Sequence, residues 1–124
     1  MKDEIADEWI TRLTSGVYHK GSGHLCKDGT HCALGVLCEI AVERGVCDRR
    51  GWKGQADVFD GEYQMNLPPK VVEWAGMKGQ DGRFRDEELA MRRYDMTSVM
   101  GINDASPRTF PEIALIIDKE RNNL

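Results

Sequence analysis

The sequence predicts an α+β domain in which several short helices pack around one or two small antiparallel hairpins. Apolar residues recur at helical spacing near both ends of the chain, and Asp28-Gly29 marks a tight turn between two strand-like segments. The chain has 124 residues, of which 40% are hydrophobic, and this suffices for one hydrophobic core. We therefore expect residues 1–124 to form a single domain.

The composition excludes several classes of protein. A net charge of −4 does not provide the basic field that a nucleic-acid-binding protein needs, so we do not expect a nucleic-acid partner. No apolar run approaches the roughly 20 residues of a membrane span, and the polar N-terminus does not resemble a signal peptide. We expect a cytoplasmic protein without a membrane partner. Its four cysteines should be free thiols, because the cytoplasm is reducing.

The first predicted element is a helix over residues 3–15. Ile5, Trp9 and Leu13 recur every four residues, which places them on one face of a helix. Gly16 follows as a suitable helix end, since glycine readily adopts the left-handed conformation found there.

A hairpin over residues 24–32 should come next. Asp28-Gly29 is the dipeptide preferred in a two-residue type I′ turn, which joins two adjacent antiparallel strands. Residues 33–44 then predict a second helix ending at Gly45, apolar enough to be the most buried helix of the domain.

The second half of the chain is expected to alternate loops and short elements: a loop over 46–54, a hairpin over 57–65, and helices over 67–75, 86–94 and 97–102. The final helix has the clearest signals, because Thr109 and Glu112 match a capping box and Pro111 suits the first turn. We expect this helix to fray from Arg121 onward.

Every histidine and cysteine of the chain lies between residues 19 and 47. They are His19, His24, Cys26, His31, Cys32, Cys38 and Cys47. Imidazoles and thiols are the side chains that bind transition metals and act as nucleophiles near neutral pH. Any such chemistry must therefore be centred on this segment.

The predicted turn fixes which of these side chains share a face of the hairpin. Cys26 should lie opposite His31, and Leu25 opposite Cys32, because a two-residue loop sets the register. Side chains alternate between the faces of a strand, so His24, Cys26 and His31 share one face. Leu25 and Cys32 should point into the core, which leaves the other face available to solvent.

Two functional interpretations of this hairpin stay open beside the simpler one. Zinc accepts two histidines and a cysteine with an open fourth position, so His24, Cys26 and His31 are candidate ligands. Cys32 precedes a helix N-terminus, which lowers a thiol pKa, and with His24 or His31 as base it is a candidate nucleophile. Ordinary hydrogen bonds for the histidines and a core position for Cys32 are the favoured alternatives, since no C-x-x-C pair is present.

Three segments are candidates for ligand binding. The first is a glycine-rich loop over 18–23, the second a basic segment with an aromatic residue over 49–53, and the third the end of the predicted helix near residue 103. The alternative for the glycine-rich loop is a flexible connector, and that for the basic segment is a solvated surface. The alternative for the helix end near residue 103 is a simple turn. The candidate residues are Tyr18, Lys20, Arg49, Arg50, Trp52, Asn103 and Asp104.

An ordered set of short patterns runs through nearly the whole chain. Residues 32–39 read CALGVLCE, close to CCLGVLCD, residues 67–76 read LPPKVVEWAG, and ND at 103–104 precedes FPEIALII at 110–117. This set resembles a widespread family of small uncharacterised proteins from phage, prophage and bacterial genomes. The resemblance implies a phage- or host-associated cytoplasmic accessory protein, and it implies no particular reaction.

The sequence thus leads us to expect a non-enzymatic accessory protein that binds a host protein or a small metabolite. The alternative is a zinc protein or cysteine-dependent enzyme centred on the first hairpin. A third alternative is a homo-oligomer that buries Trp52, Phe59 or Tyr63.

Overall fold

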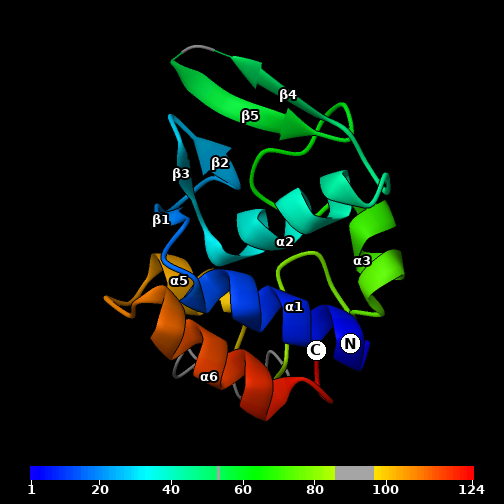
Figure 1. Cartoon of the computed structure of the whole chain (residues 1–124), viewed down its shortest axis with the longest axis vertical. Helices are drawn as coiled ribbons and strands as arrows, with labels where there is room; N and C mark the ends of the chain where they lie inside the picture. The colour runs from blue at the N-terminus through cyan, green and yellow to red at the C-terminus, as the bar shows by residue number, and fades with distance from the viewer. Residues whose placement is uncertain (53, 86–96) are drawn as a thin grey trace.

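The described part of the chain folds into helices and one mixed sheet, which confirms the α+β prediction (Figure 1). The computed structural model describes residues 1–52, 54–85 and 97–124, and the side chain of Trp52 lies outside this part. The helix expected over 86–94 also lies outside the described residues. No described helix has the length and apolar character needed to cross a membrane.

The helices of the described part alternate with five short strands. The helices are α1 (Asp3–Thr14), α2 (Ala33–Glu43), α3 (Pro69–Ala75), α5 (Val99–Asp104) and α6 (Phe110–Glu120). The strands are β1 (His19–Lys20), β2 (Cys26–Lys27), β3 (Thr30–His31), β4 (Arg49–Trp52) and β5 (Gln55–Phe59). They form a sheet in the order β1-β3-β2-β5-β4, in which β1 and β3 are parallel and the other neighbours antiparallel.

The first hairpin has the predicted turn and register. Asp28 and Gly29 both have positive φ, 51° and 80°, as a type I′ turn requires. Cys26 pairs with His31 and Lys27 with Thr30 across β2 and β3. The local turn chemistry was therefore sufficient to set this register.

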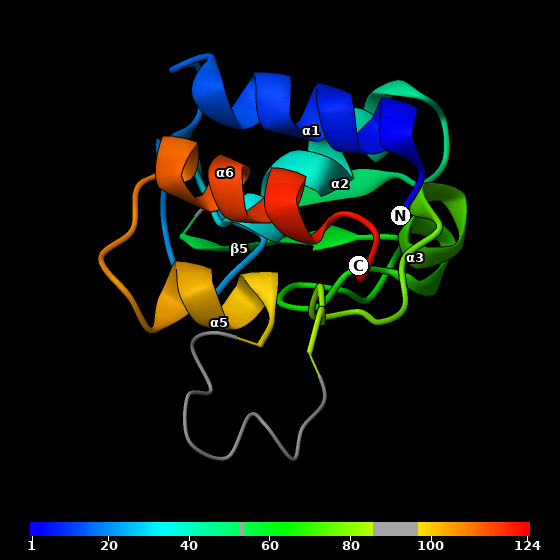
Figure 2. The ribbon, with the colours of Figure 1, turned by 90° about the horizontal axis from the view of Figure 1, so that it is seen from below.

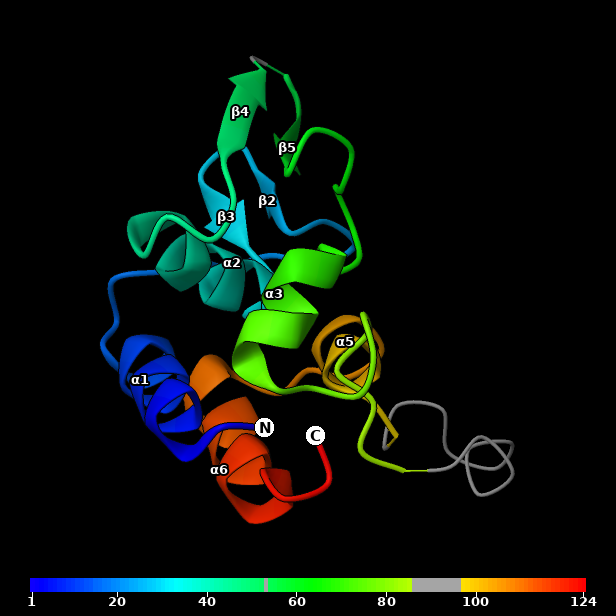
Figure 3. The same ribbon diagram turned by 90° about the vertical axis from the view of Figure 1, so that its right-hand side faces the viewer.

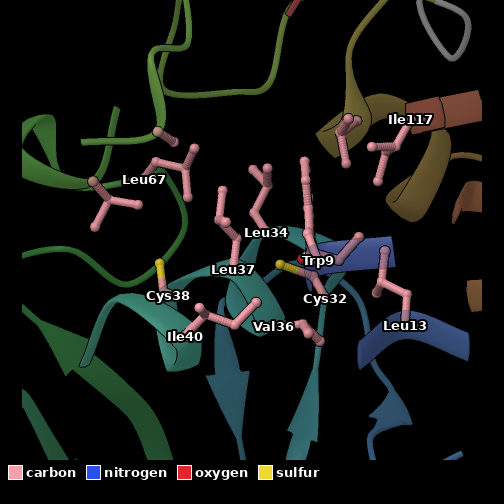
Figure 4. Close-up of a cluster of buried hydrophobic side chains, with 14 of the residues drawn as sticks. Trp9, Leu13, Cys32, Leu34, Val36, Leu37, Cys38, Ile40, Leu67 and Ile117 are labelled. Atoms are coloured by element: carbon pink, nitrogen blue, oxygen red, sulfur yellow. Dashed lines mark hydrogen bonds between the residues drawn. The ribbon is translucent and has the colours of Figure 1, made fainter. Parts of the chain in front are cut away.

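Helix α2 is buried along most of its length, and Figure 4 shows its side chains within a cluster of buried hydrophobic residues. Leu34, Leu37 and Ile40 are fully buried, and the Trp9 indole of α1 donates a hydrogen bond of 2.8 Å to the Ala33 carbonyl. This confirms the prediction that the second helix forms the core.

Gly35 lets α2 approach the first hairpin closely. A Cβ atom at this position would lie 1.7 Å from the carbonyl oxygen of Leu25, well inside van der Waals contact. Only glycine fits here, and the close approach sets α2 directly against the segment leading into β2.

The termini lie side by side, since α1 and α6 pack along each other (Figure 2). The Met1 ammonium donates a hydrogen bond of 2.9 Å to the Leu124 carbonyl. Helix α6 ends at Glu120, as expected, and the Arg121 guanidinium pairs with Asp7 at 2.8 Å and with Asp118 at 2.6 Å. These ion pairs and the burial of Leu124 hold the end of the chain against α1.

The prediction of a loop over residues 46–54 is wrong. Arg49–Trp52 form β4, which pairs antiparallel with β5 and carries a bulge between Arg50 and Trp52. Of the hairpin expected over 57–65, only a bridge between Phe59 and Tyr63 is present. Charged residues and Gly51 give β4 little strand propensity of its own, so pairing with β5 decides its conformation.

The C-terminal helices follow their local signals. Helix α3 ends at Gly76, whose φ of 70° is the expected left-handed cap. Helix α6 begins with the predicted capping box between Thr109 and Glu112. Helix α5 begins slightly later than predicted, because the Ser98 side chain caps it by accepting a hydrogen bond from the Gly101 N–H.

Candidate functional site

A cluster of polar side chains lies where the first hairpin, α2 and the β4–β5 hairpin meet. We call it the inner cluster, and its members are Cys26, His31, Glu39, Arg49 and Asp57. Arg49 joins its parts: Nη1 lies 2.6 Å from Glu39 Oε1, and Nη2 pairs with the Asp57 carboxylate. The same Nη2 atom lies 4.0 Å from Cys26 Sγ.

Strand alternation explains how the inner cluster assembles. Cys26 and His31 are cross-strand partners, so their side chains share one face of the first hairpin. Arg49 is the cross-strand partner of Phe59, and Asp57 lies two residues earlier on the same face of β5. Because β2 pairs with β5, these side chains lie on the same face of one continuous sheet.

The expectation that the Cys26–His31 face is available to solvent is wrong. Cys26 is 2% exposed and His31 is 8% exposed. The sheet continues from β2 into β5 and β4, where a loop and a different hairpin were expected, and Arg49 and Asp57 reach over this face. The Cys26–His31 face of the first hairpin is therefore covered, whereas Thr30 on the opposite face is exposed.

His31 has the least satisfied side chain of the inner cluster. Both ring nitrogens are buried and have no hydrogen-bond partner among the described residues. Nε2 lies 3.7 Å from Glu39 Oε1, which is an ion-pair distance but too long for a hydrogen bond. The Tyr18 ring packs edge-on against the imidazole, with 5.1 Å between ring centroids. Tyr18, a candidate ligand-binding residue, thus contacts the inner cluster.

The thiols of the first hairpin are poorly suited to nucleophilic chemistry. Burial, together with the nearby Asp57, raises the pKa of Cys26 to about 12. Burial also raises the pKa of Cys32 to about 11, although its sulfur accepts a hydrogen bond from the Gly35 N–H at 3.3 Å. The expected lowering of the Cys32 pKa by the helix N-terminus is wrong, because desolvation of the thiolate is the larger effect. The prediction that the four cysteines are free thiols is confirmed.

The structure brings together only part of the candidate zinc set. Cys26 and His31 are neighbours, whereas His24 lies in the bend before β2, outside the paired strands. In the described ranges, no three histidine, cysteine, aspartate or glutamate side chains are arranged to hold a metal ion.

Two of the three candidate ligand-binding segments meet each other. Lys20 Nζ donates a hydrogen bond of 2.9 Å to the Asn103 carbonyl, and the Gly23 N–H donates one of 3.1 Å to Asp104 Oδ1. The Asn103 amide is 1% exposed; it donates to the Gly21 carbonyl and accepts from the Ala33 N–H. Lys20, Asn103 and Asp104 therefore join the glycine-rich loop to α5.

The third candidate segment is divided between two faces of the β4–β5 hairpin. Arg49 points into the inner cluster, whereas Arg50 pairs with Val58 on the opposite, outer face. A pocket of about 250 Å³ is lined there by Asp48, Arg49, Arg50, Val58 and Gly61. Asp48 and Val58 were missed, because only recognition of β4 as a strand places them beside Arg50.

The aromatic residues proposed for a homo-oligomer do not form the expected exposed surface. Phe59 is fully buried beneath the Arg49 guanidinium, which lies 5.8 Å from the ring centroid. Tyr63 is partly buried against the core. The Trp52 side chain lies outside the described part of the chain.

The fold and its polar cluster define a small α+β domain with a mixed sheet and a buried central helix. The chain belongs to the family described as a domain of unknown function, DUF8296, whose model matches residues 1–121. This confirms the resemblance to an uncharacterised family. Comparison with curated proteins and with solved structures finds no match.

Proposed function

We propose that this protein is a non-enzymatic, cytoplasmic accessory protein of the phage or prophage type, which binds a host protein or a small metabolite. Its binding surface is the outer face of the β4–β5 hairpin, defined by Asp48, Arg50 and Val58. The ordered sequence patterns described above support the accessory role.

The difference between two adjacent arginines carries this proposal. Arg49 is committed to ion pairs with Glu39 and Asp57. Arg50 lines the pocket on the outer face and has no ion-pair partner within the described part of the chain. An exposed guanidinium beside a pocket can bind carboxylate or phosphate oxygens in two parallel hydrogen bonds.

The position of the hairpin makes its outer face accessible. In Figure 3, β4 and β5 project beyond the helical body of the molecule. Strand β4 forms the edge of the sheet, but its bulge and its arginines disfavour pairing with another strand. Side chains on the outer face, rather than the strand edge, are therefore the proposed contacts.

The state of the thiols favours binding over thiol catalysis. Burial raises the pKa values of Cys26, Cys32 and Cys47 to about 11 or 12, so few of these groups are thiolates at neutral pH. A cysteine nucleophile needs the opposite shift.

The test compares partner capture by the wild-type protein and by two charge-reversed variants. Arg50→Glu reverses the charge on the outer face, and Lys119→Glu makes the same change on the exposed side of α6. We expect a host protein or metabolite to be retained by the wild type and by Lys119→Glu but lost from Arg50→Glu. Titration calorimetry with the purified partner then measures how much affinity the Arg50→Glu variant has lost.

Circular dichroism of all three proteins shows whether the fold is intact. Equal affinity of the identified partner for wild-type protein and folded Arg50→Glu contradicts the assignment of the outer face.

A further inference from the structure

The pocket on the outer face is lined by one carboxylate, Asp48, and by Arg49 and Arg50, of which Arg49 is already paired with Glu39 and Asp57. Arg50 lies in β4, and Asp48 precedes it by two residues while its carbonyl accepts a hydrogen bond of 2.9 Å from the Asp60 N–H. Asp48 lies directly before β4, two residues from Arg50, and both residues line the pocket. The pocket therefore presents a guanidinium and a carboxylate next to each other.

Neither charge is neutralised inside the described part of the chain. Asp48 and Arg50 form no ion pair with each other or with another described residue, whereas neighbouring Asp60 lies 3.5 Å from Lys70 Nζ. Val58, the cross-strand partner of Arg50, is partly buried and adds an apolar wall. The Gly61 backbone lines the remaining side of the pocket.

These charges select against simple ions. Asp48 repels an anion that approaches Arg50, and Arg50 repels a cation that approaches Asp48. A molecule with a carboxylate and an ammonium group a few ångströms apart can pair with Arg50 and Asp48 at the same time. The volume of about 250 Å³ is below the range of about 300–1,000 Å³ that is usual for drug-sized ligands, so the ligand must be small.

We propose that this pocket binds a small zwitterion of the α-amino-acid class with an apolar side chain. This inference rests on the proposed function and names its ligand. The ligand carboxylate pairs with the Arg50 guanidinium, its ammonium group with the Asp48 carboxylate, and its side chain packs against Val58.

The probe is L-leucine, and binding is followed by the backbone amide NMR signals of the full chain. We expect the signals of Asp48, Arg50 and Val58 to shift with a dissociation constant in the millimolar range, because few contacts are available. Isocaproate lacks the ammonium group and isoamylamine lacks the carboxylate. Each analogue should bind up to about fivefold more weakly, which is the upper end of the contribution of an exposed ion pair.

Two variants test the same contacts from the protein side. Arg50→Gln and Asp48→Asn should each weaken leucine binding up to about fivefold. The matched control Lys119→Gln removes a charge on α6 and should leave the affinity for leucine unchanged.

Two results overturn the inference: isocaproate binding as tightly as leucine, or the absence of shifts in these signals at about 20 mM leucine. If partner capture still depends on Arg50 in either case, the ligand class is wrong while the binding function stands.

Discussion

The two faces of the β4–β5 hairpin use the same residue types for different purposes. On the inner face, Arg49 is held between Glu39 and Asp57 and covers the Phe59 ring. On the outer face, Arg50 stands beside a small pocket without such partners in the described part of the chain. The two arginines are adjacent in sequence, so the side of the strand, and not the residue type, separates the structural role of Arg49 from the binding role that we propose for Arg50.

We expect the largest loss of stability from a methyl group added where α2 packs against the first hairpin. Gly35→Ala would place a Cβ 1.7 Å from the Leu25 carbonyl oxygen, so the backbone of α2 or of the Leu25 segment must move. We expect a loss of about 3 kcal/mol or more in the free energy of unfolding, measured by urea denaturation.

Gly51→Ala on β4 is the matched control for this change. Its Cβ would meet Asp57 Oδ1 at 3.4 Å, an ordinary contact, so stability should change by less than about 1 kcal/mol. Similar losses for the two variants would contradict the tight packing of α2 against the first hairpin.

The thiols give a second measure of packing on the inner side. A rise of the Cys32 pKa from 9.0 to about 11 lowers its thiolate fraction about a hundredfold at neutral pH. Iodoacetamide should therefore label the folded protein far more slowly than the urea-unfolded protein, as measured by mass spectrometry. A fast-reacting Cys26 or Cys32 in the folded protein would revive the cysteine-dependent alternative.

Replacing each arginine in turn tests the two faces directly. Arg49→Ala leaves the buried Asp57 carboxylate and the partly buried Glu39 carboxylate without their cation. Because the guanidinium is partly exposed to solvent, we expect a loss of only about 1–2 kcal/mol. Arg50→Ala should change stability by less than about 0.5 kcal/mol. Equal losses in the free energy of unfolding of the two variants, measured by urea denaturation, would contradict the larger structural role of Arg49.

Of the two faces of the β4–β5 hairpin, acid should affect the stability contributed by the inner one, and only mildly. Burial of Glu39 opposes ionisation, but His31 and Arg49 together lower its pKa below 4.5. The unfolded chain then binds protons more readily than the folded one, so this stabilisation is present above pH 4.5 and is lost as the pH falls through the folded pKa.

The acid effect is measured with the variant Glu39→Gln. The free energy of unfolding of this variant, measured by urea denaturation, should fall less steeply with decreasing pH than that of the wild type. We expect the difference to stay under about 1 kcal/mol. Arg50→Gln is the control and should follow the wild-type curve. An unchanged pH dependence in Glu39→Gln would show that the inner cluster does not stabilise the ionised Glu39.

Local signals in the sequence determined the helices and the first turn. The spacing of Ile5, Trp9 and Leu13, the Asp28-Gly29 turn and the Thr109–Glu112 capping box act within a few residues. Their physical causes are backbone conformation and nearby hydrogen bonds, so they can be recognised without knowledge of the rest of the fold.

Only the tertiary structure decided which polar side chains of the two hairpins are buried and which are exposed. The sequence correctly paired Cys26 with His31, but the cover over this pair comes from Arg49 and Asp57, which are distant along the chain. Strand β4 forms because β5 supplies its hydrogen-bond partners, and this pairing also separates Arg49 from Arg50. Burial and charge compensation depend on such non-local pairing, which no short pattern in the sequence encodes.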